Sequence, residues 1–163
     1  MSPNFKRRYG LLLLACLVVV PLDQWTKYLV IQHFELYQSR TIVQHYLNLV
    51  YVQNSGAAFG IFADSAIRVP FLSAIAILAI AVIVWILPRL EPQQRWLRLG
   101  LVLVLPGALG NLIDRLRFGA VIDFIDVHWY QYHWPAFNVA DSAITLGVTC
   151  MLLDLLWSRR SGN

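Results

Sequence analysis

Charged side chains are scarce in this sequence. Only 13% of the 163 residues are Asp, Glu, Lys or Arg, whereas 58% are hydrophobic, and the mean hydropathy is +0.59. A chain of this length is too short for two ordinary domains and too apolar for one soluble domain. The composition therefore excludes a water-soluble globule and predicts a protein of the lipid bilayer.

Cysteine is also rare, and potential metal ligands are not grouped. Cys16 and Cys150 are the two cysteines of the chain, and each lies inside an apolar run, which gives no basis for a disulfide framework. His128 and His133 have no further His or Cys at a metal-ligand spacing, and we expect both in an interfacial loop. We predict neither a metal site nor a cofactor.

Acidic residues are fewer than basic ones, nine against thirteen. In a membrane protein this surplus reports orientation, because cations collect in short cytoplasmic segments. It does not indicate a nucleic-acid partner, and we predict none. The flanking cations divide eight to four, which places both termini in the cytoplasm. The larger group is Lys6, Arg7, Arg8, Arg89, Arg95, Arg98, Arg159 and Arg160, and the smaller is Arg40, Arg68, Arg115 and Arg117.

Long apolar runs indicate four membrane-spanning helices, since a bilayer core needs roughly 20 mostly apolar residues per helix. We place them at about 9–31, 69–87, 96–114 and 140–157, with extracytoplasmic loops at 32–68 and 115–139. Ile, Val, Tyr and Leu are frequent from Thr41 to Gln53, which favours a short sheet there. The predicted fold is an all-α membrane protein, a single domain over 1–163, with a small extracytoplasmic β-sheet and a short interfacial segment.

The N-terminus has a second interpretation. Basic residues followed by an apolar run and Cys16 could form a lipoprotein signal peptide that is cleaved before the cysteine. The run before Cys16 is short and continues to Leu22, as a membrane span would. We therefore favour a span.

Ionisable groups inside membrane helices are costly, at about 2.5 to 3.5 kcal/mol each on insertion scales, so they are functional candidates. Asp23 and Lys27 are four residues apart and share a helix face, where they form either an ion pair for packing or a substrate contact. A second stripe lies on the third span and consists of Gly107, Gly110, Asn111 and Asp114. Its small residues allow close packing of helices.

Carboxylates are expected to gather at the outer membrane surface: Asp114, Asp123, Asp126 and Asp141. Asn138 or Asp141 can cap the fourth helix. Capping does not explain Asp123, which lies in the apolar run Val121–Ile125 and would be desolvated there. Two neighbouring carboxyls share a proton, so that one serves as base and the other as acid on a water molecule. This pattern predicts peptide hydrolysis by an aspartic dyad.

Two other classes of function are compatible with polar groups in a membrane. A transporter could use Asp23, Lys27, Asp114 and Asp141 as an ion or proton relay, and a structural subunit could use them only to pack helices. The gathering of acids at one surface argues against the relay. The position of Asp123, which no packing role requires, argues against the structural subunit.

Five sequence blocks carry a resemblance to a known family. They are Asp23–Lys27, Asn54–Gly60, Gly107–Arg115, Val121–Phe124 and Phe137–Ser142. In this order, and in a chain of this length, they resemble bacterial lipoprotein signal peptidase, also called signal peptidase II. One departure is Pro106, which stands where the family usually has a glycine.

The resemblance implies a membrane aspartic endopeptidase with Asp123 and Asp141 as its dyad. It would remove signal peptides from diacylglyceryl-modified prolipoproteins, cutting immediately before the lipidated cysteine, near the outer face of the bacterial inner membrane. Membrane lipids and the cyclic peptide inhibitor globomycin are further implied partners. We also expect Asn54 to bind the substrate backbone. The residues implied to bind substrate or support the site are Asp23, Lys27, Asn54, Gly56, Asn111, Asp114, Arg115, Asn138 and Ala140.

Overall fold

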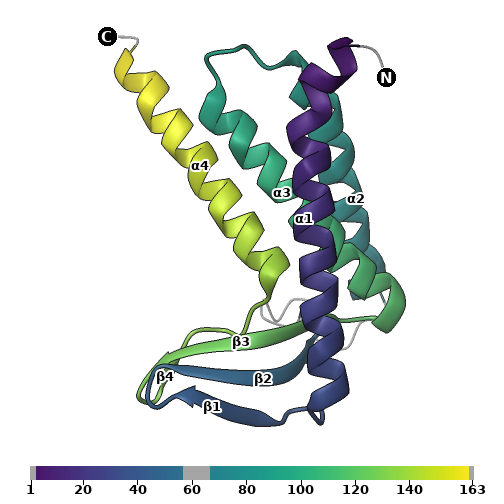
Figure 1. The fold of residues 1–163 in the computed structure, drawn as a ribbon, viewed down its shortest axis with the longest axis vertical. Coiled ribbons are helices and arrows are strands. Elements are labelled where there is room, and N and C mark those ends of the chain that lie inside the picture. Colours follow the sequence, from purple (N-terminus) through teal and green to yellow (C-terminus); the bar gives the residue numbers. More distant parts are fainter. Residues whose placement is uncertain (1–2, 57–66, 162–163) are drawn as a thin grey trace.

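The computed structural model describes residues 3–56 and 67–161, which form a helical bundle with a sheet at one end (Figure 1). The helices are α1 (Pro3–His33), α2 (Arg68–Ile86), α3 (Arg95–Phe118) and α4 (Val139–Ser161), and a 3-10 turn, η2 (Leu87–Arg89), follows α2. All four helices are long and apolar enough to cross a membrane, which confirms the four predicted spans. Both ends of the chain lie at the end of the bundle away from the sheet.

Helix α3 is longer than predicted and occupies the inside of the bundle. Half of its spanning segment is buried, against 11% to 17% for the other helices. It continues unbroken through Pro106 and ends at Gly119, whose φ of 70° is the left-handed conformation that favours glycine. The predicted span ends one turn earlier, at Asp114. The extra turn comprises Arg115–Phe118.

Small residues let α3 and α4 approach closely. A Cβ added to Gly100 would lie 2.6 Å from the carbonyl oxygen of Gly147, and a Cβ added to Gly147 would lie 2.6 Å from that of Gly100. Similarly, a Cβ on Gly107 would lie 2.5 Å from the carbonyl oxygen of Ala140. Glycine is therefore required along this interface, as is common where membrane helices pack backbone against backbone.

The sheet has four antiparallel strands in the order β1-β2-β3-β4. Strands β1 (Ser39–Val43) and β2 (Leu47–Asn54) confirm the predicted sheet, but β3 (Val121–Trp129) and β4 (Tyr132–His133) enlarge it. The segment expected to be only an interfacial loop therefore supplies half of the strands. Its first four residues, Val121–Phe124, are all buried, so the alternation that usually identifies a half-exposed strand is missing.

A second apolar core joins the sheet to α1. Val30, Tyr51, Ile122 and Phe124 are its buried members. Because side chains alternate along a strand, Ile122 and Phe124 point to this core while Asp123 between them points to the opposite face. The register of β2 on β3 pairs Val52 with Asp123 and thereby brings the end of β2 beside the dyad candidate.

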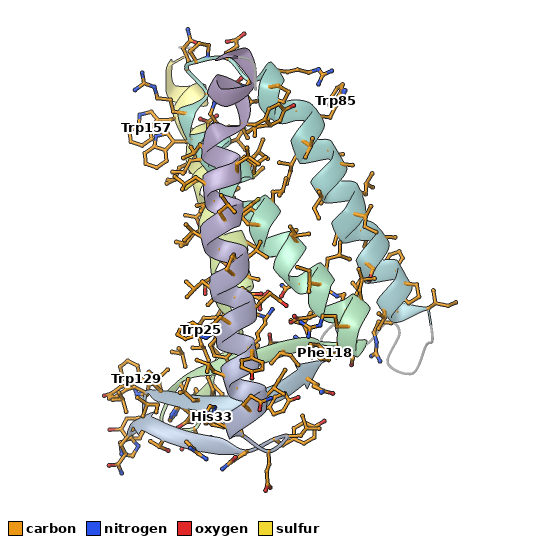
Figure 2. All side chains as sticks on the ribbon, turned by 45° about the vertical axis from the view of Figure 1, so that its right-hand side comes forward. Trp25, His33, Trp85, Phe118, Trp129 and Trp157 are labelled. Carbon is orange, nitrogen blue, oxygen red and sulfur yellow. The ribbon has the colours of Figure 1, made fainter. Side chains whose placement is uncertain are left out.

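Exposed tryptophans lie at two levels of the molecule (Figure 2). Trp85 and Trp157 lie toward the terminal end of the bundle, whereas Trp25 and Trp129 lie toward the sheet. Each is more than half exposed. Two such levels are typical of the aromatic belts of a membrane protein, because indole rings prefer the two bilayer interfaces.

Candidate active site

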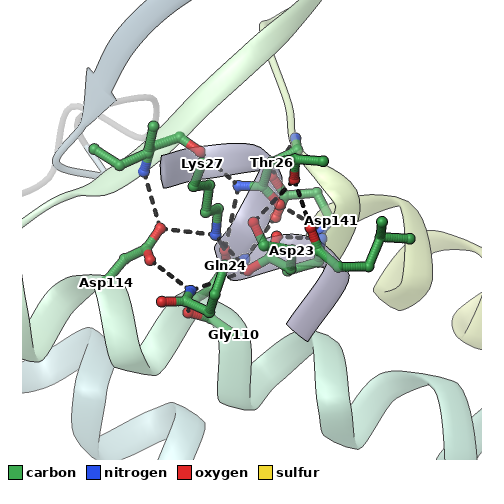
Figure 3. A network of polar contacts seen from close by, with 12 residues as sticks. Asp23, Gln24, Thr26, Lys27, Gly110, Asp114 and Asp141 are labelled. Atoms are coloured by element: carbon green, nitrogen blue, oxygen red, sulfur yellow. Dashed lines mark hydrogen bonds and ion pairs between the residues drawn. The ribbon is translucent and has the colours of Figure 1, made fainter. Parts of the chain in front are cut away.

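A layer of buried polar side chains lies where the helices meet the sheet (Figure 3). Six of them are no more than 5% exposed: Asp23, Lys27, Asn111, Asp114, Asp123 and Asn138. Polar groups removed from water in this way need hydrogen-bond partners within the protein. Contacts among the side chains and with nearby backbone groups supply those partners and link α1, α3, α4 and β3.

Lys27 is held at the centre of this layer by three acceptors, which matches the three donors of an ammonium group. Its Nζ lies 2.8 Å from Asp23 Oδ2, 2.7 Å from Asp114 Oδ2 and 3.2 Å from Asn111 Oδ1. The predicted pair of Asp23 and Lys27 is therefore extended by a second carboxylate from α3. Since every donor of the ammonium is engaged inside the protein, the geometry favours a packing role for Lys27.

Asp23 and Asp114 use their remaining lone pairs on backbone N–H groups. Ala140 N donates to Asp23 Oδ1 at 2.9 Å, and Ile122 N donates to Asp114 Oδ2 at 3.1 Å. The first bond fixes the start of α4 and the second fixes the start of β3. These two segments carry Asp141 and Asp123, so the ion cluster positions both members of the expected dyad.

Gln24 also belongs to this network, although the sequence did not single it out. Its Nε2 donates to Asp114 Oδ1 at 2.9 Å and lies 3.2 Å from Asp23 Oδ2. Figure 3 shows its amide between the two carboxylates. The available signal was its polarity inside a membrane span, next to Asp23.

Asn138 and Asp141 form a reciprocal cap at the start of α4. Asp141 N donates to Asn138 Oδ1 at 2.8 Å, and Asn138 N lies 3.3 Å from Asp141 Oδ2. This is the arrangement of a capping box, in which two free N–H groups are satisfied together. Both predicted capping candidates therefore act in one motif, and the motif fixes the orientation of the Asp141 carboxyl group.

Two asparagine side chains connect the carboxyl groups of Asp123 and Asp141. Asn138 Nδ2 donates to Asp123 Oδ1 at 2.8 Å, and Asn111 Nδ2 donates to Asp141 Oδ1 at 2.7 Å. The two asparagines also contact each other, with Asn138 Nδ2 lying 3.2 Å from Asn111 Oδ1. The structure thus brings together β3, α3 and α4 around two carboxyl groups that are 18 residues apart in sequence.

Asn54 supplies the second hydrogen bond to Asp123, through Nδ2 and Asp123 Oδ2 at 2.9 Å. Its Oδ1 accepts a bond from Gly56 N at 2.8 Å, so the amide is oriented with its NH2 group toward the carboxyl. The turn favours glycine, because Gly56 has a φ of 82°, in the left-handed region that other residues rarely adopt. Residues 57–60 of the Asn54–Gly60 block lie outside the described residues.

The pKa of the Asp123 carboxyl is raised to about 7, mainly because the group is buried and also because the charge of Asp141 is nearby. The hydrogen bonds from Asn54 and Asn138 and the charge of Lys27 act in the opposite direction. A raised pKa keeps a proton on the pair near neutral pH. The guanidinium of Arg115 also interacts electrostatically with both carboxyl groups and with Asp114. The site can therefore offer one acid, one base and a nearby cation.

Gly110 and Ala140 are the small residues of the site. A Cβ added to Gly110 would lie 2.6 Å from Asp23 Oδ2 and 3.2 Å from the Cβ of Ala140. Ala140 is fully buried. Their size is what allows α1, α3 and α4 to meet closely enough for the polar contacts above.

Asp126 does not join the other carboxylates, which corrects the expected group of four. It lies three residues after Asp123 on β3 and therefore on the other face of the strand. There it accepts from Asn48 Nδ2 at 2.8 Å and lies 2.8 Å from His133 Nδ1, and the hydrogen bonds from both residues lower the pKa of its carboxyl. His128 and His133 are also corrected from loop to strand, since they are cross-strand partners with rings 4.6 Å apart.

The chain is similar to known proteins along most of its length. The sequence profile described as "Signal peptidase (SPase) II" matches residues 15–157. The chain is 50% identical over 146 residues to the lipoprotein signal peptidase of Syntrophotalea carbinolica, covering 90% of this chain and 91% of that protein. It is 43% identical over 160 residues to the lipoprotein signal peptidase of Geobacter sulfurreducens, covering 98% of both. A bacterial membrane enzyme solved by the in meso method at 2.3 Å resolution has a TM-score of 0.84 and 32% identity, over 94% of this chain and 92% of that one.

Proposed function

Since this chain belongs to the signal peptidase II family, and is thus a bacterial membrane protease that removes signal peptides from lipoproteins, we propose that Asp123 and Asp141 perform the cleavage as an aspartic dyad. The observation that carries the proposal is the shared environment of the two carboxyl groups. Asn138 contacts both of them, and the Asp123 pKa of about 7 allows one proton to remain on the pair.

In the proposed reaction Asp123 carries the proton and Asp141 is ionised. Asp141 takes a proton from a water molecule while the water oxygen attacks the scissile carbonyl carbon. At the same time Asp123 donates its proton to the carbonyl oxygen. The tetrahedral intermediate then collapses. Asp141 passes its proton to the departing amine, the C–N bond breaks, and Asp123 regains a proton from the hydroxyl of the new carboxyl group. One water is consumed and the dyad returns to its starting protonation.

The neighbouring residues are proposed to hold this arrangement. Asn54 and Asn138 orient the Asp123 carboxyl, and Asn111 orients that of Asp141. The Arg115 guanidinium stabilises negative charge that develops on the substrate. Asp23, Lys27 and Asp114 act one layer further away, by fixing the backbone at the starts of α4 and β3.

The proposed substrate is a diacylglyceryl-modified prolipoprotein, cut immediately before the lipidated cysteine. Both termini lie in the cytoplasm and the sheet end faces outward, because the sheet end holds the smaller group of flanking cations. The dyad would then lie at the surface where an exported substrate emerges from the bilayer. The whole chain is proposed to act as one domain, and a cyclic peptide such as globomycin to inhibit it by occupying the dyad.

The test is cleavage of a diacylglyceryl-modified prolipoprotein by purified protein. We expect near-complete loss in Asp123→Asn and in Asp141→Asn, since one carboxyl cannot act as both acid and base, and such roles contribute about 10² to 10⁴ in rate. Asp126→Asn is the matched control, because it removes a carboxylate from the same strand on the other face, and it should retain cleavage. Wild-type rates in either dyad variant would disprove the assignment.

A further inference from the structure

An apolar pocket lies between the sheet end of α1 and the sheet. Its volume is about 310 Å³, at the lower end of the roughly 300 to 1,000 Å³ typical of small-molecule sites. Residues between Thr26 and Phe34, on the last turns of α1 and just after it, form one wall, and Leu49 of β2 and Phe124 of β3 form the other. Figure 2 shows His33 at the sheet end of this helix, with Trp25 further along it.

The pocket is separate from the dyad. Phe124 faces the pocket, whereas Asp123, its neighbour on β3, faces the opposite side of the strand. Both edges of β3 are also occupied here: β2 pairs with one edge, and the backbone of Phe137 bonds Phe124 and Ile125 on the other. A group bound in this pocket would therefore lie behind the strand that carries Asp123.

The pocket is continuous with the lipid-facing surface of the protein. Only 11% of the α1 spanning segment is buried inside the protein, and Trp25 and Tyr28 beside the pocket are both more than half exposed. In a bilayer this surface is covered by acyl chains. An apolar indentation at the end of the span is accordingly within reach of the chains of the adjoining leaflet.

A cation contacts two residues that line the pocket. The guanidinium of Arg40 lies 4.7 Å from the centre of the Phe34 ring, and its Nη2 donates to the carbonyl oxygen of His33 at 3.1 Å. Both of these residues line the pocket. Among the described residues no carboxylate forms a salt bridge with Arg40. Its charge is thus available to an anion such as the phosphate of a lipid headgroup.

We propose that this pocket binds one glycerophospholipid, with an acyl chain against Leu29, Leu49 and Phe124 and the phosphate on Arg40. The phosphate distinguishes this ligand from the proposed substrate, because a diacylglyceryl group on cysteine has two acyl chains but no phosphate. The bound chain packs on the face of β3 opposite Asp123 and supports that strand against α1.

The test measures the binding of dioleoylphosphatidylglycerol to delipidated protein in detergent, with native mass spectrometry as the readout. Arg40→Gln changes an exposed side chain and should weaken binding about fivefold, as expected for one surface cation beside a phosphate. Leu29→Trp fills the pocket and should weaken binding about tenfold. The matched controls are Arg117→Gln, another exposed arginine over an aromatic ring, and Leu17→Trp, a lipid-facing position on α1. Both should bind as wild type does.

A parallel titration with dioleoylglycerol separates the two parts of the ligand. This probe has the chains without the phosphate, so Leu29→Trp should weaken its binding while Arg40→Gln should not. Equal binding of both probes by the wild-type protein would overturn the phosphate contact, and equal binding by Leu29→Trp and Leu17→Trp would overturn the pocket. Neither outcome depends on cleavage, so the dyad proposal is tested separately.

Discussion

Replacing Asp123 by Asn should abolish cleavage and also change how stability depends on pH. The carboxyl has a pKa of 3.8 when unperturbed and about 7 in the folded protein, chiefly because it is buried. The fold therefore favours the protonated form. This contribution to stability is complete below pH 3.8 and is lost as pH rises toward 7, because the unfolded chain then ionises while the folded protein does not.

The size of the effect follows from the pKa values. One pKa unit corresponds to about 1.4 kcal/mol. Between pH 5 and pH 7 the unfolded chain ionises Asp123 and the folded protein does not, so the wild-type protein is about 3 kcal/mol less stable at pH 8 than at pH 5. The Asp123→Asn variant does not lose this energy, because an amide does not titrate. It does lose a hydrogen bond at both pH values, since Asn54 and Asn138 both present donors and an amide offers one acceptor oxygen. That constant cost is about 1 to 3 kcal/mol.

The measurement is the melting temperature of Asp123→Asn minus that of the wild type, determined at pH 5 and again at pH 8 and then compared. Thermal unfolding in detergent, followed by tryptophan fluorescence, would be compared for Asp123→Asn and wild type at pH 5 and pH 8. The melting temperature of the variant relative to that of the wild type should be about 5 to 10 °C higher at pH 8 than at pH 5, by the scaling for chains of this size. Ser142→Ala is the control, because it removes the hydrogen bond to Asn138 O without removing a titratable group. Equal effects of Asp123→Asn at both pH values would refute the argument.

Three further predictions concern the same site. Cleavage should decline as pH rises above about 7, because Asp123 then loses the proton that the mechanism requires, and a pH–rate profile that is flat from about 6 to 9 would contradict this. Asn54→Ala should reduce kcat by about tenfold or more through the lost bond to the Asp123 carboxyl, as measured by prolipoprotein cleavage; unchanged rate and affinity would exclude a role for Asn54. Gly110→Ala should lower the melting temperature and the yield of folded protein, because the added Cβ would lie 2.6 Å from Asp23 Oδ2. Gly10→Ala is the control and should be tolerated, since its added Cβ would have no neighbour within 4 Å. Similar melting temperatures for the two variants would contradict this account of the packing around Gly110.

Hydropathy was sufficient to locate the four helices, because the bilayer imposes length and apolarity on each span independently of the others. The ends were less accurate. The C-terminal end of α3 depends on Gly119 and on the sheet that follows, so its last turn was missed. Strand β3 was missed for a related reason: a strand buried on both faces has no alternation, and only its pairing with β2 distinguishes it from an apolar loop.

The sequence grouped four acidic residues at one surface, and the fold separates one of them from the others. Asp123 and Asp126 are three residues apart, and the two-residue period of a strand sends their side chains to opposite faces. Asp126 therefore bonds Asn48 and His133, while Asp123 turns toward Asn54 and Asn138. The spacing of the two residues acquires this meaning only once the segment is known to be a strand.

The sequence by itself determined that this is a four-span membrane protein of the signal peptidase II family, and which carboxylates to consider. Composition and short motifs are sufficient for this, because lipid solvation and local spacing act on each segment separately. Only the tertiary structure decided which groups touch: that Lys27 joins Asp23 to Asp114, that Asn138 connects the two dyad candidates, and that Arg40 lies over the ring of Phe34 beside an apolar pocket. These contacts join residues far apart in the chain, and their geometry exists only once the helices and the sheet have packed together.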